Sequence, residues 1–208
     1  MNELVLILVA YALGSIPTAV LISKKFFAID IRDYGSGNAG ATNTFRVLGK
    51  KAGIPVLLID IIKGTLAVAL VYLTSFERGS NDFISLQLGL GVAALLGHIF
   101  PVFAGFRGGK GVATILGIVI CVLPLASGLG LLVFLCVLLS TRIVSLSSML
   151  AGVSFPLFLI FILKEQNPIL ISFSIAVGVL LIITHRKNIK RLLNKQENKI
   201  NLFKSKNA

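Results

Sequence analysis

Charged residues are scarce in this sequence. They make up 13% of its 208 residues, whereas an average soluble domain contains roughly a quarter. Hydrophobic residues make up 56%, and the mean hydropathy is +0.95. This balance excludes an ordinary soluble protein. Because about 20 apolar residues cross a bilayer and such runs consume most of the chain, we expect one helical membrane domain over residues 1–208, including a basic tail over 185–208.

Cysteine and acidic residues are scarce as well. Cys121 and Cys136 stand alone in apolar runs, which excludes a disulfide framework or a zinc site, and we expect neither a metal nor another cofactor. Eight acidic residues face 20 basic ones, giving a net charge of +12. Membrane proteins concentrate Lys and Arg in cytoplasmic loops, and anionic lipids and phosphate substrates attract the same charge. We therefore expect membrane lipid as a partner and no nucleic acid.

The N-terminus lacks the basic residues with which a signal peptide begins. It carries Glu3 instead, and Lys24 and Lys25 follow the apolar run. This polarity predicts an uncleaved first helix with its N-terminus outside.

Six apolar segments follow one another along the chain. They are Leu4–Ile22, Ala52–Thr74, Ile84–Phe106, Val112–Leu139, Ile143–Leu163 and Pro168–Thr184. The basic residues between them place the loops 24–51 and 107–111 and the tail from Arg186 in the cytoplasm. The tail is expected to begin as an amphipathic helix along the membrane and then to fray.

The segment Val112–Leu139 decides the topology. It is too long for one typical span, too short for two full ones, and carries Pro124 and Ser127-Gly128 near its middle. We predict a hairpin of two short helices there. The chain is then an all-α membrane protein with seven transmembrane helices, its N-terminus outside and its C-terminus cytoplasmic. The alternative, five crossings with one long helix, would leave the basic tail outside.

The first cytoplasmic loop contains a glycine-rich segment, Gly35-Ser36-Gly37-Asn38-Ala39-Gly40-Ala41-Thr42-Asn43. Glycines let backbone N–H groups converge on an anion, and Ser, Thr and Asn add further donors. Arg46 adds a guanidinium contact if a helix begins near Asn43. The segment matches neither a Walker A loop nor a dinucleotide fingerprint. A phosphate cradle is favoured over a flexible connector.

A second glycine-rich loop ends in Gly108-Gly109-Lys110-Gly111, where a new helix is expected to begin. Backbone donors beside a lysine suit phosphate, and the alternative is a cationic anchor in a flexible turn. His98, before this loop, fits a structural and a functional role equally well.

Three further groups attract attention. The hydroxyl-rich segment 140–148, with Arg142 and Ser145, suits either helix capping or binding of a polar substrate. His185 and Asn188 are three apart in a basic helix and are candidates for substrate contact. Asp60 and Lys63 are also three apart, within an apolar segment; we expect a salt bridge close to its cytoplasmic end that supports the first loop.

These segments resemble the bacterial PlsY family, membrane acyltransferases that use acyl phosphate to acylate glycerol 3-phosphate. The resemblance covers nearly the whole chain and rests on GSGNAGATN with Arg46, GHIFPVFAGFRGGKG, TRIVSLSS, and HRKNIKRLL followed by Glu197. The tail departs from the family, because Lys195-Gln196 replaces the usual Gly-Glu. Glu197 is then the nearest carboxylate.

The resemblance implies seven helices and acyl transfer to the 1-hydroxyl of sn-glycerol 3-phosphate, the first acylation in bacterial phospholipid synthesis. The products would be 1-acylglycerol 3-phosphate (lysophosphatidic acid) and inorganic phosphate. The protein would lie in the bacterial inner membrane, with its active site facing the cytoplasm. Acyl phosphate would come from a separate soluble enzyme, with which a transient contact is expected.

The resemblance also implies roles for individual residues. Catalysis is expected of Ser36, Asn43, Lys110 and His185. Substrate binding is expected of Gly35, Ser36, Gly37, Asn38, Gly40, Ala41, Thr42, Asn43, Arg46, Lys110, Arg142, Ser145, His185 and Asn188. The first glycine loop would hold the phosphate of acyl phosphate, while Arg46, Lys110, His185 and Asn188, with Ser145 nearby, would engage glycerol 3-phosphate. Neither histidine has an aspartate five residues on, so we expect positioning to dominate and a substrate phosphate to take the hydroxyl proton.

A small phosphate or anion transporter is the main alternative. Its site would lie near the membrane midplane, whereas the cationic segments of this chain all fall on one face. A purely structural scaffold leaves the two glycine-rich loops unexplained.

Overall fold

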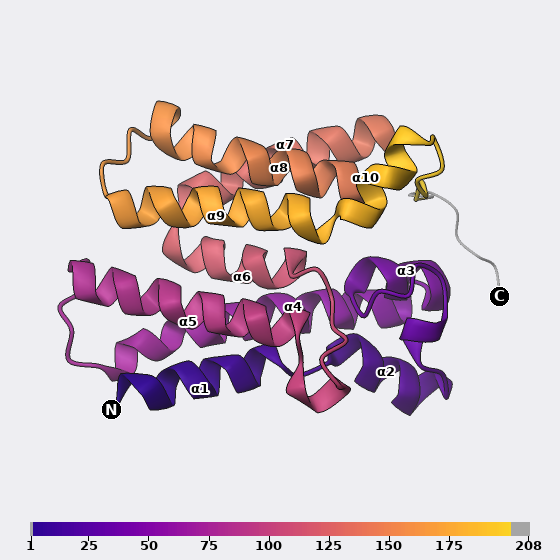
Figure 1. Ribbon diagram of the computed structural model, residues 1–208, viewed down its shortest axis with the longest axis horizontal. Helices are drawn as coiled ribbons and strands as arrows, with labels where there is room; N and C mark the ends of the chain where they lie inside the picture. Colours follow the sequence, from indigo (N-terminus) through magenta and orange to yellow (C-terminus); the bar gives the residue numbers. More distant parts are fainter. Residues whose placement is uncertain (1, 201–208) are drawn as a thin grey trace. The chain divides into compact units, whose positions relative to one another are not determined.

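A computed structural model describes residues 2–200, and every regular element within them is helical (Figure 1). The predicted all-α class is therefore confirmed for this part of the chain. The helices gather into two compact units that divide after Leu125. That the chain acts as one membrane domain stays a prediction.

The first unit contains the apolar helices α1, α4, α5 and α6, and the helices α2 and α3 lie at one end of it (Figure 1). Helix α4 packs against α1, α5 and α6, and α1 packs along α5. The elements are α1 (Glu3–Gly14), α2 (Thr18–Phe27), η1 (Ile31–Asp33), α3 (Ala41–Leu48), α4 (Lys50–Ala69), η2 (Leu70–Leu73), α5 (Asn81–Ile99), η3 (Val102–Ala104) and α6 (Val112–Val122).

Small residues let these helices approach closely. On α4 a Cβ at Gly64 would collide with the carbonyl oxygen of Thr114, and on α6 a Cβ at Gly117 would collide with that of Ile61. Thr65 adds a hydrogen bond from Oγ1 to the carbonyl of Gly117, at 3.1 Å. In lipid there is no hydrophobic driving force between apolar helices. Close backbone contact at glycines therefore supplies packing energy instead.

The first apolar segment forms one candidate span, Glu3–Phe27, but the helix within it is interrupted. Helix α1 ends at Gly14 and α2 begins at Thr18, with Pro17 between them. Proline has no N–H to donate, and it disfavours helical backbone in the residue before it. The interruption exposes backbone carbonyls that must find partners inside the unit.

The second unit contains α7 (Pro124–Thr141), α8 (Val144–Leu157), the π-helical segment η4 (Phe158–Ile162), α9 (Pro168–Thr184) and α10 (Arg186–Leu193). Helix α8 packs along α9, and α10 turns by 60° from α9. The predicted basic helix at the start of the tail is confirmed as α10. The end of the tail, 201–208, lies outside the described residues.

The structure divides the segment Val112–Leu139 into two helices, as predicted, and the break falls at Pro124, the first of the two sites that the sequence offered. Helix α6 ends at Val122 and α7 begins with Pro124, whereas Ser127-Gly128 lie inside α7. Proline suits the first position of a helix, where its missing N–H is not needed. Helix α7 has 18 residues, so only α6, with 11, is short.

The described residues contain five helices long and apolar enough to span a membrane, or six if the bent pair α9–α10 forms one span. Several membrane-spanning helices are thus present. The count of seven and the sides of the termini remain predictions.

Reporter fusions test the topology. Fusions at Arg142 and after the last residue should both report the cytoplasm, because the tail is rich in Lys and Arg and two predicted spans lie between it and Arg142. If the two fusions reported opposite sides of the membrane, the seven-helix topology would be wrong.

Gly117→Ala tests the close approach of α4 and α6. The added methyl meets the backbone of Ile61, which cannot move aside, so we expect a loss of about 1–3 kcal/mol in unfolding free energy. Gly89→Ala on α5 is the matched control, because a Cβ there meets nothing within 4 Å. Thermal unfolding in detergent, followed by circular dichroism, should separate the two variants; equal midpoints would contradict the packing described.

Candidate active site

A buried ion pair lies at the centre of the first unit. Lys63 Nζ lies 2.9 Å from Asp60 Oδ1, and the two side chains are 4% and 2% exposed. Thr18 donates to the same carboxylate oxygen at 3.0 Å, and Lys63 donates to the carbonyl of Ile16 at 3.0 Å. The predicted salt bridge is confirmed. Its predicted position near a helix end is wrong, because both residues lie in the middle of α4 and their partners lie at the break between α1 and α2.

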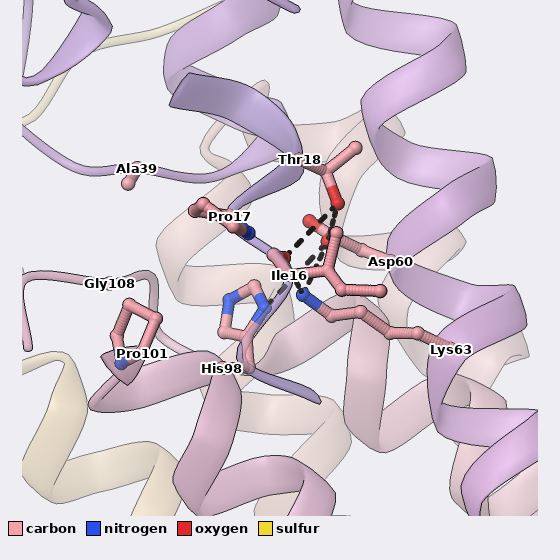
Figure 2. A pocket seen from close by; sticks show the side chains of 9 residues that line it. All are labelled: Ile16, Pro17, Thr18, Ala39, Asp60, Lys63, His98, Pro101 and Gly108. Carbon is pink, nitrogen blue, oxygen red and sulfur yellow. Dashed lines mark hydrogen bonds and ion pairs between the residues drawn. The ribbon is translucent and has the colours of Figure 1, made fainter. Parts of the chain in front are cut away.

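His98 on α5 completes this buried polar cluster. It is 7% exposed, and its Nδ1 lies 3.7 Å from Asp60 Oδ1. Figure 2 shows the imidazole and the Lys63 ammonium on the same side of the Asp60 carboxylate. The three side chains are separated by up to 38 positions in sequence, and only the packing of α4 against α5 brings them together.

A small pocket lies over the cluster. Asp60, Lys63 and His98 line it together with Ala39 from the first glycine loop and Gly108 from the second (Figure 2). The two loops that the sequence singles out therefore meet at one place in the first unit.

Asn43 holds the first glycine loop in shape. Its Oδ1 accepts from the N–H of Ser36 at 2.8 Å, and its Nδ2 donates to the carbonyls of Ile31 and Tyr34 at 3.1 and 3.0 Å. The residue is 1% exposed. Gly35 has φ +63°, and a Cβ there would collide with the Asn43 side chain. The segment is a shaped loop and not a flexible connector.

Helix α3 begins at Ala41, close to the predicted start, so Arg46 lies one turn beyond Asn43 on the same helix. Gly40 is its N-cap residue, and within the described chain no side chain caps this end. The first turn of α3 follows directly on the glycine loop, an arrangement that suits an anion.

Arg32 joins the two loops. Its Nε and Nη2 donate to Asp30 at 2.9 and 2.7 Å, and its Nη1 donates to the carbonyl of Ala104 in the second loop at 2.8 Å. Hydrogen bonds from Arg32 hold the pKa of Asp30 well below its usual range, against the effect of partial burial. From the sequence, Arg32 was interpreted only as a cytoplasmic charge. Asp30, two positions earlier, was the signal that could have revealed their ion pair.

The second glycine loop folds back onto the end of α5. The N–H groups of Gly108 and Gly109 donate to carbonyls in the last turn of that helix, at 3.2 and 3.1 Å. Lys110 follows, and Gly111, with φ +83°, is the N-cap of α6, which begins at Val112. The prediction that Lys110 precedes a new helix is confirmed.

In the second unit, Glu197 gathers three polar side chains. Its Oε1 accepts from Ser145 Oγ at 2.9 Å and from Asn188 Nδ2 at 2.6 Å, and its Oε2 accepts from Arg191 Nε at 2.9 Å. Burial raises the pKa of Glu197, but the hydrogen bonds from Asn188, Ser145 and Arg191 outweigh it, so the pKa falls below its ordinary value. Glu197 thus fastens the tail to α8 and α10.

His185 stands at the bend between α9 and α10. It is 2% exposed, its ring Nδ1 lies 2.8 Å from the carbonyl oxygen of Leu181, and its own carbonyl accepts from the N–H of Asn188 at 2.8 Å. The structure therefore brings His185 and Asn188 together as predicted. Arg142 is exposed. Its carbonyl accepts from the N–H of Ile200, in the tail, at 2.8 Å.

The hydroxyl-rich segment does not cap α8. Ser147 and Ser148 donate to carbonyls four residues earlier, and Ser145 donates to Glu197. No side chain among the described residues caps the start of α8. Of the two roles left open by the sequence, the capping role is excluded for these serines.

Five span-length helices, buried charges and two shaped glycine loops define an integral membrane protein with a polar site inside an apolar helical unit. The family model for glycerol-3-phosphate acyltransferases matches residues 4–195. The chain belongs to this family, the PlsY type of membrane acyltransferase.

Individual relatives agree. A protein of Bacillus anthracis named glycerol-3-phosphate acyltransferase 2 is 48% identical over 200 residues, which cover 96% of this chain and all of the relative. A glycerol-3-phosphate acyltransferase of Enterococcus faecalis is 47% identical, covering 96% of this chain and 93% of its own length. The crystal structure of PlsY, an integral membrane glycerol 3-phosphate acyltransferase, in its glycerol 3-phosphate form superposes with a TM-score of 0.85 at 40% identity, covering 97% and 99% of the two chains. Its lysophosphatidic acid form gives a TM-score of 0.81, also at 40% identity, covering 96% and 95%.

Glu197→Gln tests the tail fastening. Because the folded-state pKa of Glu197 is lowered, ionised Glu197 stabilises the second unit above its ordinary pKa, and that contribution disappears as pH falls through the folded-state value. We expect the thermal midpoint of the variant to lie below wild type at pH 7, and the difference to shrink below about pH 4.5. A difference independent of pH would contradict the role of the charge.

Proposed function

We propose that this protein transfers a fatty acyl group from acyl phosphate to the 1-hydroxyl of sn-glycerol 3-phosphate. The products are 1-acylglycerol 3-phosphate, which is lysophosphatidic acid, and inorganic phosphate. Family membership supports acyl transfer to glycerol 3-phosphate. The solved forms of the PlsY neighbour, one with glycerol 3-phosphate and one with lysophosphatidic acid, support the acceptor and the product.

The meeting of the two glycine loops in the first unit carries the proposal. Ala39 and Gly108 line one pocket, and Arg32 ties the loops together through the carbonyl of Ala104. Each loop adjoins a cation, Arg46 in one case and Lys110 in the other. Two glycine-rich segments, each next to a cation, suit a reaction in which both substrates carry a phosphate.

The chemistry requires little covalent help from the protein. Acyl phosphate is a mixed anhydride, so its carbonyl carbon is already activated. The oxygen of the acceptor hydroxyl bonds to that carbon, and the bond from the carbon to the phosphate oxygen breaks. The phosphate leaves with the electron pair, and the hydroxyl proton passes to a phosphate oxygen. Fixed donors around the leaving phosphate lower the barrier through electrostatics, and the cations orient the acceptor, with no covalent enzyme intermediate.

The residue roles follow the loops. In the first unit, Ser36 and the backbone of its loop hold the phosphate of acyl phosphate, and Asn43 shapes that loop. Arg46 and Lys110 engage the phosphate of glycerol 3-phosphate. The second unit contributes substrate contacts through Arg142, Ser145, His185 and Asn188. We propose no cofactor.

The location is part of the proposal. Lys and Arg gather in the loops and the tail that the positive-inside rule assigns to the cytoplasm. We place the protein in the bacterial inner membrane with its active site facing the cytoplasm, where a soluble enzyme would supply acyl phosphate. The alternative of an anion transporter finds no support in the family assignment.

Purified protein in detergent should release inorganic phosphate and form lysophosphatidic acid when given acyl phosphate and glycerol 3-phosphate. Lys110→Ala should lower kcat/KM for glycerol 3-phosphate roughly 10- to 100-fold, the cost of losing a hydrogen bond to a charged group. Lys51→Ala, at an exposed lysine in the first turn of α4, is the matched control and should keep wild-type turnover.

A parallel assay with acyl-CoA tests the donor. Turnover with acyl-CoA and none with acyl phosphate would overturn the proposed donor while leaving acyl transfer intact. Wild-type turnover in Lys110→Ala would overturn the assignment of the cation.

A further inference from the structure

The imidazole of His98 lies directly beneath Gly109. A Cβ built at Gly109 would collide with Nε2 of that ring and would lie 3.0 and 3.1 Å from Cε1 and Cδ2, so its three nearest atoms all belong to His98. Gly109 does not have the left-handed backbone that favours glycine. The ring beneath it, and not its own conformation, is what leaves no room for a side chain there.

The ring packs against the buried ion pair. Its Nδ1 lies 3.7 Å from Asp60 Oδ1 and has no hydrogen-bond partner among the described residues, while that carboxylate is bound by Lys63 at 2.9 Å and by Thr18 at 3.0 Å. The backbone of His98 contributes as well, because its carbonyl accepts from the N–H of Gly109 at 3.1 Å. The loop therefore packs on a side chain that itself packs against the buried ion pair.

We infer that His98 is a positioning residue for the loop that carries Lys110. Its ring sets the path of Gly108-Gly109 over the end of α5, and this path sets where the Lys110 ammonium stands. Both ring nitrogens face the chain, Nε2 toward Gly109 and Nδ1 toward Asp60. The role is thus one of shape and support, distinct from proton transfer to a substrate. Its consequence for the reaction rests on the proposed function of Lys110.

A double-mutant cycle tests this contact. Gly109→Ala should raise the KM for glycerol 3-phosphate by more than about tenfold, because the methyl forces the loop off the ring. His98→Ala should raise it severalfold, because the loop loses its support. In the double variant the methyl occupies space that the ring has vacated. Its KM should therefore fall well below that of Gly109→Ala and lie within about threefold of that of His98→Ala.

Gly108→Ala provides the matched control. A Cβ at Gly108 would meet the carbonyl oxygens of His98 and Ile99 and the ring of Pro101, none of which His98→Ala removes. The effects of Gly108→Ala and His98→Ala should therefore multiply. The KM for acyl phosphate should change less than twofold in every variant, a separation that general unfolding would not produce. If His98→Ala fails to fold, His98→Ser takes its place in the same cycle.

Two outcomes overturn the inference. One is a double variant at Gly109 and His98 whose KM is the product of the single effects, as at Gly108. The other is equal damage to the KM of both substrates. The cycle is also measured as thermal midpoints in detergent, where His98→Ala should relieve the destabilisation caused by Gly109→Ala. Wild-type protein without acyltransferase activity would remove the proposed function, whereas the thermal cycle would still decide whether the ring supports the loop.

Discussion

The ion pair of Asp60 and Lys63 is the interaction on which the first unit depends. A lone charge inside an apolar bundle is costly, and removing one partner of a buried pair costs about 3–5 kcal/mol because the other is left uncompensated. Here the pair also forms hydrogen bonds with polar groups at the break between α1 and α2. Lys63 takes up a carbonyl exposed where the first helix breaks at Pro17, and Asp60 receives the hydroxyl of Thr18. A proline break and a buried charge, each unfavourable alone, thus stabilise each other.

The two glycine-rich loops are also held by defined contacts. His98 packs against Asp60 and lies beneath Gly109. Arg32 bridges the two loops, and Asn43 fixes the first loop by three hydrogen bonds. Catalysis by electrostatic positioning needs donors that are already in place when charge develops, since reorganising them during the reaction would cost what they contribute. A glycine-rich segment gives close backbone approach, and the surrounding side chains remove the flexibility that glycine would otherwise bring.

Features of the fold and the site that depend on neighbouring residues were predictable from the sequence. Features that depend on contacts between residues far apart in the chain were not. Apolar runs predicted the helices, and the spacing of Asp60 and Lys63 predicted their pairing, because both are properties of neighbouring residues. The break at Pro17 was missed, since hydropathy over Leu4–Ile22 averages across one proline. The second helix break was predicted near Pro124 and Ser127-Gly128, and it falls at Pro124, where the missing N–H of proline marks a helix boundary. The partners of Glu197 were beyond prediction, because Ser145 lies 52 positions away and only the fold joins them.

The few carboxylates of the chain explain how so basic a protein holds together. Of its eight acidic residues, Asp30, Asp60 and Glu197 each pair with a cation within their own unit. The tail contains one such carboxylate, Glu197. Gln196 stands where the resemblance led us to expect an acid, and it is exposed, while Glu197 turns inward to Ser145, Asn188 and Arg191. Each of these pairs neutralises a cation of the fold, and the net charge of +12 comes from the basic residues in excess of the acidic ones, a balance that suits phosphate substrates and anionic lipid.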